Sequence, residues 1–162
     1  MTWDVMDAAH PRNHDAKPVH TPSEPAMTTF ASSPRFLRAV LWADAASCLA
    51  TGTLQLAALD ALPRLFGLPQ GLLLDTGVFL VAYALLAAWT ATREVPPRKW
   101  VALFAIGNVA WAIGCAIAVF TLQPATPGIA WIAVQAAAVL VLADLQWMGL
   151  RRGAVGARAA LG

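Results

Sequence analysis

The sequence predicts an all-α, polytopic membrane protein, a bundle of four transmembrane helices that follows an N-terminal tail. Two observations predict this class. Of the 162 residues, 59% are hydrophobic and 12% are charged, whereas soluble domains carry about 45–50% apolar and about 25% charged residues. The apolar residues also fall into four stretches, each near the roughly 20 residues that cross a bilayer core. This composition argues against a disordered protein, a nucleic-acid binder and most soluble enzymes.

Residues 1–34 differ in composition from the rest of the chain. They contain five prolines and all three histidines, and no apolar period of a helix or strand is sustained there. We therefore expect a disordered cytoplasmic tail. An alternative is that translation starts at Met27, so that residues 1–26 lie upstream of the true start. The histidines are too widely spaced in a proline-rich segment to predict a metal site.

The transmembrane domain is expected over residues 35–152, before a short cytoplasmic tail at 153–162. Prolines, glycines and charged residues separate the apolar stretches, and such residues end one helix and begin the next. No stretch shows the polar face that each helix of a soluble bundle carries. Rows of small residues every four positions predict close helix packing. The four expected spans are 36–59, 72–91, 100–122 and 128–147.

The basic residues predict the orientation, because cytoplasmic loops of membrane proteins are enriched in Lys and Arg. Arg64 stands alone on one side of the expected bundle. The opposite side carries Arg35, Arg38, Arg93, Arg98, Lys99, Arg151, Arg152 and Arg158. Both termini are therefore expected in the cytoplasm, with the bundle in the inner (plasma) membrane of the cell. Trp89, Trp100 and Trp147 fall at the inner ends of spans, as an interfacial aromatic belt requires.

Polar residues within the spans are the candidate site. Asp44 shares one face of the first span with Ser47, Cys48, Thr51 and Gln55, at helical spacing. The helical rise of about 1.5 Å per residue places Asp44, Tyr83 and Asn108 about 11–13 Å from the cytoplasmic side. This predicts an intramembrane cluster with further members around it. The full candidate set is Asp44, Ser47, Tyr83, Asn108, Trp111 and Gln135.

Each of these residues has a structural interpretation beside a functional one. Asn and Gln between membrane helices commonly form interhelical hydrogen bonds of about 0.6–2 kcal/mol, and this favours a structural role for Asn108 and Gln135. A carboxyl group is costly in a membrane unless it is protonated or paired. Asp44 is therefore either a functional protonatable group or a neutral acid that donates one structural hydrogen bond.

Catalytic chemistry is not expected. The spans contain no histidine, and Cys48 and Cys115 have no second thiol nearby. No phosphate-binding loop, nucleophile–histidine–acid set or metalloprotease pattern can be assembled. We therefore expect no enzyme, no cofactor and no metal. The expected partners are the lipid bilayer and either a second copy of the chain or another membrane protein, with no nucleic acid.

Three segments resemble small, uncharacterised four-helix integral membrane proteins of bacteria: residues 41–48, 107–111 and 135–136. The resemblance covers about residues 35–152 and implies the fold without an activity. Small multidrug exporters also have four helices and an acid in the first, but their motifs are not matched, so that likeness is architectural.

The function expected from these observations is that of an accessory, assembly or structural subunit of the membrane. The alternative is a small proton-coupled transporter in which Asp44 takes up and releases the proton. A transporter would place Asp44 at a water-filled cavity in a symmetric dimer. An accessory protein would bury Asp44 among hydrogen-bond partners and would lack a cavity of useful volume.

Overall fold

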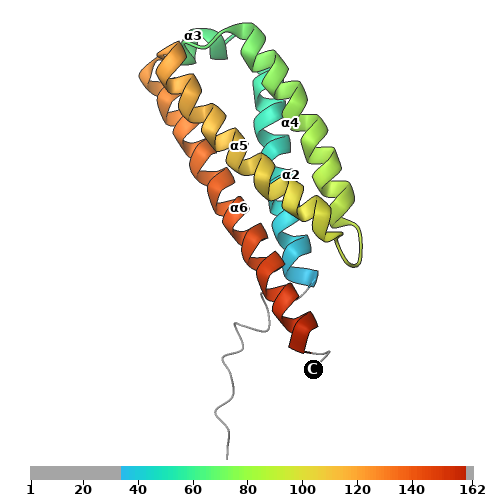
Figure 1. Ribbon diagram of the computed structural model, residues 1–162. Coiled ribbons are helices and arrows are strands. Elements are labelled where there is room, and N and C mark those ends of the chain that lie inside the picture. The colour runs from blue at the N-terminus through green and yellow to red at the C-terminus, as the bar shows by residue number, and fades with distance from the viewer. Residues whose placement is uncertain (1–33, 160–162) are drawn as a thin grey trace, which may run out of the picture.

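The computed structural model describes residues 34–159, with side chains as far as Arg152, and this part of the chain contains helices and short connections (Figure 1). The expected tail before Pro34 and the alternative start at Met27 lie outside the described residues. The helices are α2 (Pro34–Ala57), α3 (Leu62–Phe66), α4 (Gln70–Ala91), α5 (Arg98–Leu122) and α6 (Thr126–Ala159).

Prolines and left-handed residues set the helix boundaries. Pro69 and Pro97 are the N-caps of α4 and α5, each in an extended conformation. Gly67 ends α3 with φ of 67° and donates its N–H to the carbonyl of Pro63. Gln123 ends α5 with φ of 46°, and the proline that follows it cannot extend the helix.

Two elements differ from the sequence-based expectation. The segment 62–69, which lies between the first two expected spans, contains the short helix α3, and Pro63 lies in its first turn, where a missing N–H costs nothing. Helix α6 spans 34 residues, so it passes the expected end at 147 and continues into the expected tail. Arg151 and Arg152 mark a membrane boundary by charge, but arginine is a good helix former and does not end a helix.

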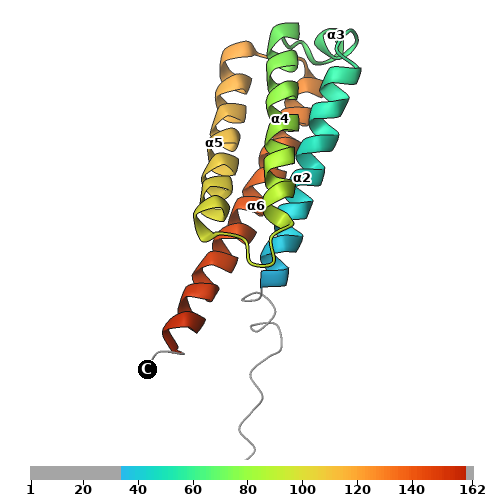
Figure 2. The same cartoon turned by 90° about the vertical axis from the view of Figure 1, so that its right-hand side faces the viewer.

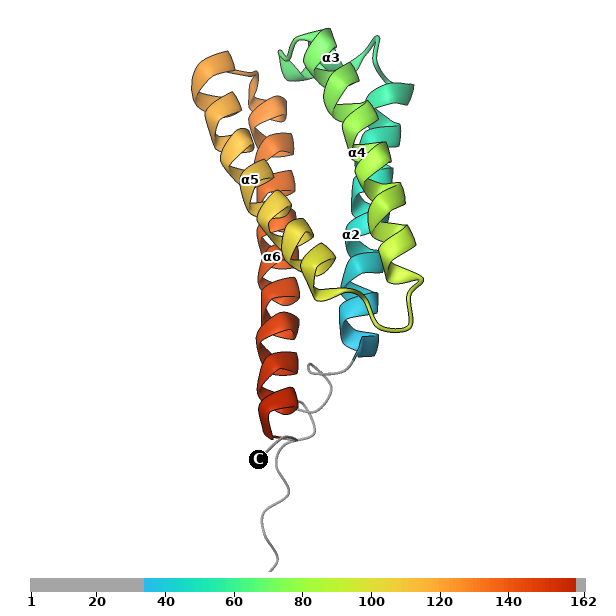
Figure 3. The same cartoon turned by 45° about the vertical axis from the view of Figure 1, so that its right-hand side comes forward.

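The four long helices form two antiparallel pairs. Helix α4 packs along α2, and α5 packs along α6. The pairs meet mainly where α2 contacts α6, and α3 lies against the start of α6 (Figures 1 and 3). The start of α2 and the end of α6 lie at the same end of the bundle, and α3 lies at the other (Figure 2). We call these the terminal end and the α3 end.

Small residues allow close packing in the first pair. A Cβ atom added to Gly52 of α2 would lie 2.8 Å from the backbone oxygen of Gly77 in α4. The row of small residues on α5 behaves differently, because a Cβ added to Gly114 would meet no atom within 4 Å. The expected close packing is therefore found between α2 and α4, whereas the row on α5 borders open space.

Three of the helices are long and apolar enough to cross a membrane: α4, α5 and residues Thr126–Arg152 of α6. Helix α2 is not among them, since it carries two arginines, Asp44 and several hydroxyl and amide side chains. Large apolar side chains face outward on all three spans; Phe120 is 81% exposed, Val134 68% and Leu85 64%. Such continuous exposure is unfavourable in water and typical of a lipid-facing surface, so the described helices indicate a membrane protein.

Candidate functional site

Asp44 lies at the centre of a polar cluster that joins all four long helices. Its side chain has no exposed surface. One carboxyl oxygen, Oδ2, accepts hydrogen bonds from the hydroxyl of Tyr83 at 3.1 Å, from Nδ2 of Asn108 at 3.0 Å and from Nε2 of Gln146 at 2.8 Å. The other, Oδ1, accepts the thiol of Cys48 at 3.6 Å. One carboxyl group thus links α2 with α4, α5 and α6.

The structure brings together the three residues at the core of the predicted cluster, Asp44, Tyr83 and Asn108. Tyr83 is held on a second side by the edge of the Phe104 ring, with ring centroids 5.3 Å apart. Phe104 is itself almost completely buried. The phenol is therefore fixed by packing as well as by its hydrogen bond, so its hydroxyl stays directed at the carboxyl group.

The other predicted members do not reach the carboxyl group. The hydroxyl of Ser47 donates to the backbone carbonyl of Asp44 at 2.9 Å, a local bond within α2. Trp111 stacks on Phe79, with ring centroids 5.8 Å apart and planes 5° from parallel. Gln135 lies farther toward the α3 end of α6, where it lines a cavity.

Gln146 is a member of the cluster that the sequence analysis missed. It is fully buried, donates to Asp44, and accepts from Nδ2 of Asn108 through Oε1 at 3.4 Å. Helical spacing could have predicted that Gln146 belongs to the cluster. Gln135 and Gln146 are eleven residues apart, which is three turns, so they share one face of α6. Their separation along the axis is about 16 Å, so only one of them can lie at the level of Asp44.

The electrostatics of the cluster suit a carboxylate. Within the described residues, each side chain that hydrogen-bonds to Asp44 is neutral and is placed as a donor. An ionised carboxylate only accepts hydrogen bonds, whereas a protonated one must also donate. Hydrogen bonds to a charged acceptor are about twice as strong as neutral ones. The four donors therefore stabilise a buried negative charge without a basic partner.

We expect Gln146→Leu to lower the free energy of unfolding in detergent micelles by about 1–2 kcal/mol, because it removes one donor from a buried charge and leaves Asn108 with fewer partners. The measurement is a denaturant titration followed by far-UV circular dichroism. Gln123→Leu is the matched control, since Gln123 is exposed at the end of α5. Equal stability of the two variants would contradict the place of Gln146 in the cluster.

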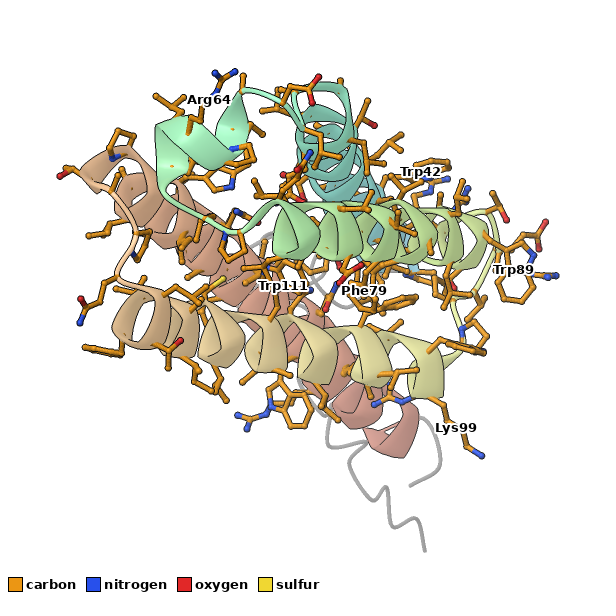
Figure 4. The ribbon with its side chains drawn as sticks, turned by 90° about the horizontal axis from the view of Figure 1, so that it is seen from above. Trp42, Arg64, Phe79, Trp89, Lys99 and Trp111 are labelled. Carbon is orange, nitrogen blue, oxygen red and sulfur yellow. The ribbon has the colours of Figure 1, made fainter. Side chains whose placement is uncertain are left out.

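A cavity of about 540 Å³ lies between the two helix pairs on the α3 side of the cluster. Cys48, Tyr83 and Asn108, which bind Asp44, also form part of its wall. Phe79 and Trp111 stack across it between α4 and α5 (Figure 4). The rest of the wall consists of Gln55, Leu68, Leu72, Leu73, Thr76, Leu80, Gly107, Ala110, Gly114, Cys115, Ala118, Trp131, Ile132, Gln135 and Val139.

Some polar side chains of this wall have hydrogen-bond partners within the protein, and one does not. Thr76 donates to the carbonyl of Leu72 at 2.6 Å and lies 3.2 Å from Oε1 of Gln55. Trp131 stacks on Phe66 of α3, with centroids 5.4 Å apart, but its indole N–H is buried and has no hydrogen-bond partner among the described residues. Buried donors are nearly always paired in folded proteins, so this N–H is an exception among the described residues.

The described residues contain no group of three or more His, Cys, Asp and Glu side chains that could hold a metal ion. Comparisons with protein-family models, with curated proteins and with solved structures found no match to this chain. The resemblance of residues 41–48, 107–111 and 135–136 to small bacterial membrane proteins therefore stays an expectation. Inference about function rests on the cluster and the cavity.

Proposed function

We propose that the chain is a four-span protein of the bacterial inner membrane, in which α2 crosses the membrane together with α4, α5 and α6. Two of the polar residues that lower the hydropathy of α2, Asp44 and Gln55, are buried on its inner side. Near its start, Arg38 donates to the carbonyl of Ala91 at the end of α4. Its outward side carries Trp42, Leu49 and Leu54, each 45–48% exposed. A helix with this distribution can face lipid while it contributes polar groups to the protein interior.

The proposed orientation places the terminal end in the cytoplasm, because the basic residues gather there. We expect alkaline phosphatase, which is active only outside the cytoplasm, to be inactive when fused after Arg152 and active when fused after Gln123. A fluorescent protein that folds only in the cytoplasm is the complementary reporter and should give the reverse pattern. High phosphatase activity from the fusion after Arg152 would contradict the orientation.

Within this membrane, we propose an accessory or structural role, as a subunit or assembly partner of other membrane proteins. The observation that carries the proposal is the complete burial of Asp44 among four neutral donors. The cavity of about 540 Å³ differs from what we expected of an accessory protein and favours the second proposal below. The hydrogen bonds to the Asp44 carboxylate fix the positions of the four helices relative to one another. The outward faces of α4, α5 and α6 then offer apolar surface to lipid or to a partner helix.

The test of this role is affinity purification of the tagged chain from native membranes in a mild detergent. We expect a membrane protein to be recovered in a constant molar ratio across independent preparations. Phe120→Ala is a surface variant of interest, because its ring is the most exposed of the large apolar side chains among the described residues. Recovery of the chain without such a partner, together with pH-dependent solute flux in vesicles, would contradict the accessory role.

A small proton-coupled transporter is the second proposal, and one observation favours it. Cys48, Tyr83 and Asn108 contact Asp44 and also line the cavity, so a solute in the cavity would lie one hydrogen bond from the carboxylate. We expect a transporter to release a fluorescent substrate from proteoliposomes only under a pH gradient, and Asp44→Asn to abolish that flux. Flux that Asp44→Asn leaves unchanged would exclude Asp44 as the proton carrier.

A further inference from the structure

We propose that the cavity between the helix pairs binds one acyl chain of a membrane phospholipid. This ligand site is independent of the proposed accessory role, because it does not involve a protein partner or a change at Asp44. Four properties of the cavity lead to the inference: the chemistry of its wall, its route of access, its shape and the depth of its α3 end.

The wall of the cavity carries no charged side chain. Leucine, isoleucine, valine, alanine and aromatic residues form most of it, with the hydroxyl of Thr76 and the amides of Gln55 and Gln135 between them. A volume of about 540 Å³ falls in the range of about 300–1,000 Å³ that is typical of ligand sites. The site therefore suits a neutral, mainly apolar group.

Access to the cavity lies between α4 and α5. Phe79 on α4 and Gly114 on α5 both belong to the wall and are both exposed, so the cavity opens to the surface between these two helices. Both helices are apolar enough to span a membrane. An opening between two membrane spans faces the hydrocarbon of the bilayer, which is the phase that contains acyl chains.

The cavity is elongated along the helix axes. Its wall follows α4 from Leu72 to Tyr83 and α5 from Gly107 to Ala118, eleven residues in each case, which is about 16 Å along the axis. A space elongated in the direction of the membrane spans suits an extended hydrocarbon chain.

The α3 end of the cavity lies at the level where a phospholipid ester group is found. Trp131 is five residues from the start of α6, or about 8 Å along the axis. The candidate span Thr126–Arg152 has 27 residues and is about 40 Å long, so about 5 Å at each end exceeds the roughly 30 Å hydrocarbon core. Trp131 therefore lies close to the core boundary, where phospholipid ester carbonyls meet the acyl chains. Gln135 lies one turn deeper on the same wall.

The proposal is tested with the purified full chain in vesicles of phosphatidylcholine and phosphatidylglycerol that contain a phosphatidylcholine with a diazirine in one acyl chain. After illumination, mass spectrometry locates the lipid adducts. We expect adducts on the cavity side of α5, at Cys115 and Ala118, at yields at least as high as those at Ile117 and Phe120. The latter two side chains lie outside the cavity and are 56% and 81% exposed, so they report ordinary contact with bulk lipid at a similar depth.

One pair of variants separates a bound chain from bulk lipid. Gly114→Leu fills the cavity and should lower the adducts at Cys115 and Ala118 at least fivefold relative to those at Ile117. Gly71→Leu adds the same side chain outside the cavity, where a Cβ also meets nothing within 4 Å, and should leave the yields within twofold.

Two outcomes would overturn the proposal. The first is that neither Gly114→Leu nor Ala110→Leu changes the yield of cavity adducts, although circular dichroism shows intact helices. This result would mean that no chain occupies the cavity. The second is that an excess of a prenylated quinone removes the cavity adducts and the same excess of unlabelled phosphatidylcholine does not, which would assign the cavity to a quinone. Loss of the adducts in competition with unlabelled phosphatidylcholine supports the acyl chain.

Discussion

Replacement of Asp44 by leucine is expected to lower the free energy of unfolding in detergent micelles by about 3–5 kcal/mol. The substitution removes the acceptor shared by Tyr83, Asn108 and Gln146, and it leaves two buried donors and one partly buried donor without this partner. Each unsatisfied donor costs about 1–3 kcal/mol, although hydrogen bonds between membrane helices average nearer 0.6 kcal/mol. The loss should appear in denaturant unfolding followed by circular dichroism.

Asp44→Asn separates the two states of the carboxyl group that the sequence leaves open. The amide oxygen can take the place of Oδ2 and accept the same three donors, with the amide nitrogen turned toward Cys48. If Asp44 is a carboxylate, the variant loses charge assistance in these bonds and should be destabilised by about 1–2 kcal/mol. If Asp44 is a neutral acid, the variant should match the natural chain within about 0.5 kcal/mol.

Asp144→Asn is the control for this substitution. Asp144 also lies on a membrane-spanning helix and loses the same charge, but it is exposed. We expect its variant to stay within about 0.5 kcal/mol of the natural chain. A loss of stability at Asp144 equal to that at Asp44 would show that the charge change itself, and not the cluster, causes the effect.

Helical periodicity was sufficient to predict the core of the cluster. Polar residues spaced three and four positions apart place Asp44 on an inward face, and in the structure this side chain is fully buried. Counting the rise along each helix also predicted the shared level of Tyr83 and Asn108, since neighbouring antiparallel helices begin near a common plane. Residue type and rise were enough here because these helices end at prolines or charged turns that the sequence displays.

The same counting failed on α6 because the end of that helix was misplaced. An end at residue 147 puts Gln146 at the membrane boundary and Gln135 nearer the midplane. The helix in fact continues to Ala159 and extends beyond the other three at the terminal end (Figure 2). Gln146 is therefore level with Asp44, and Gln135 lies about 16 Å farther along. Because the end of α6 was placed too early in the sequence, the depth expected for each residue of that helix was wrong.

The cavity could not be predicted from residue types. A row formed by Ala110, Gly114 and Ala118 has the spacing that predicts close helix contact. In the structure these residues line open space, because α5 pairs with α6 and diverges from α4. Which face of a helix meets a neighbour depends on the pairing of all four helices. Local sequence gives only the size of the side chains on that face.

A second large effect is expected from Gly128→Ala, the addition of one methyl group near the start of α6. A Cβ atom at this position would collide with the backbone oxygen of Phe66 at the end of α3. That oxygen already accepts the N–H of Ala125 at 2.9 Å, so it cannot move aside without breaking this bond. Unlike a flexible side chain, it is fixed by the helix turn that contains it. We expect a loss of about 2–4 kcal/mol in the free energy of unfolding.

Gly114→Ala makes the same change in a helix where the new methyl group meets no atom within 4 Å. Alanine is the better helix former by about 1 kcal/mol, so this variant should gain about 0.5–1 kcal/mol. The two substitutions therefore have opposite signs, although both replace a helical glycine by alanine. Chemical denaturation of both variants in the same micelles measures the difference. A gain in stability for Gly128→Ala would mean that α3 does not lie against α6 in the membrane.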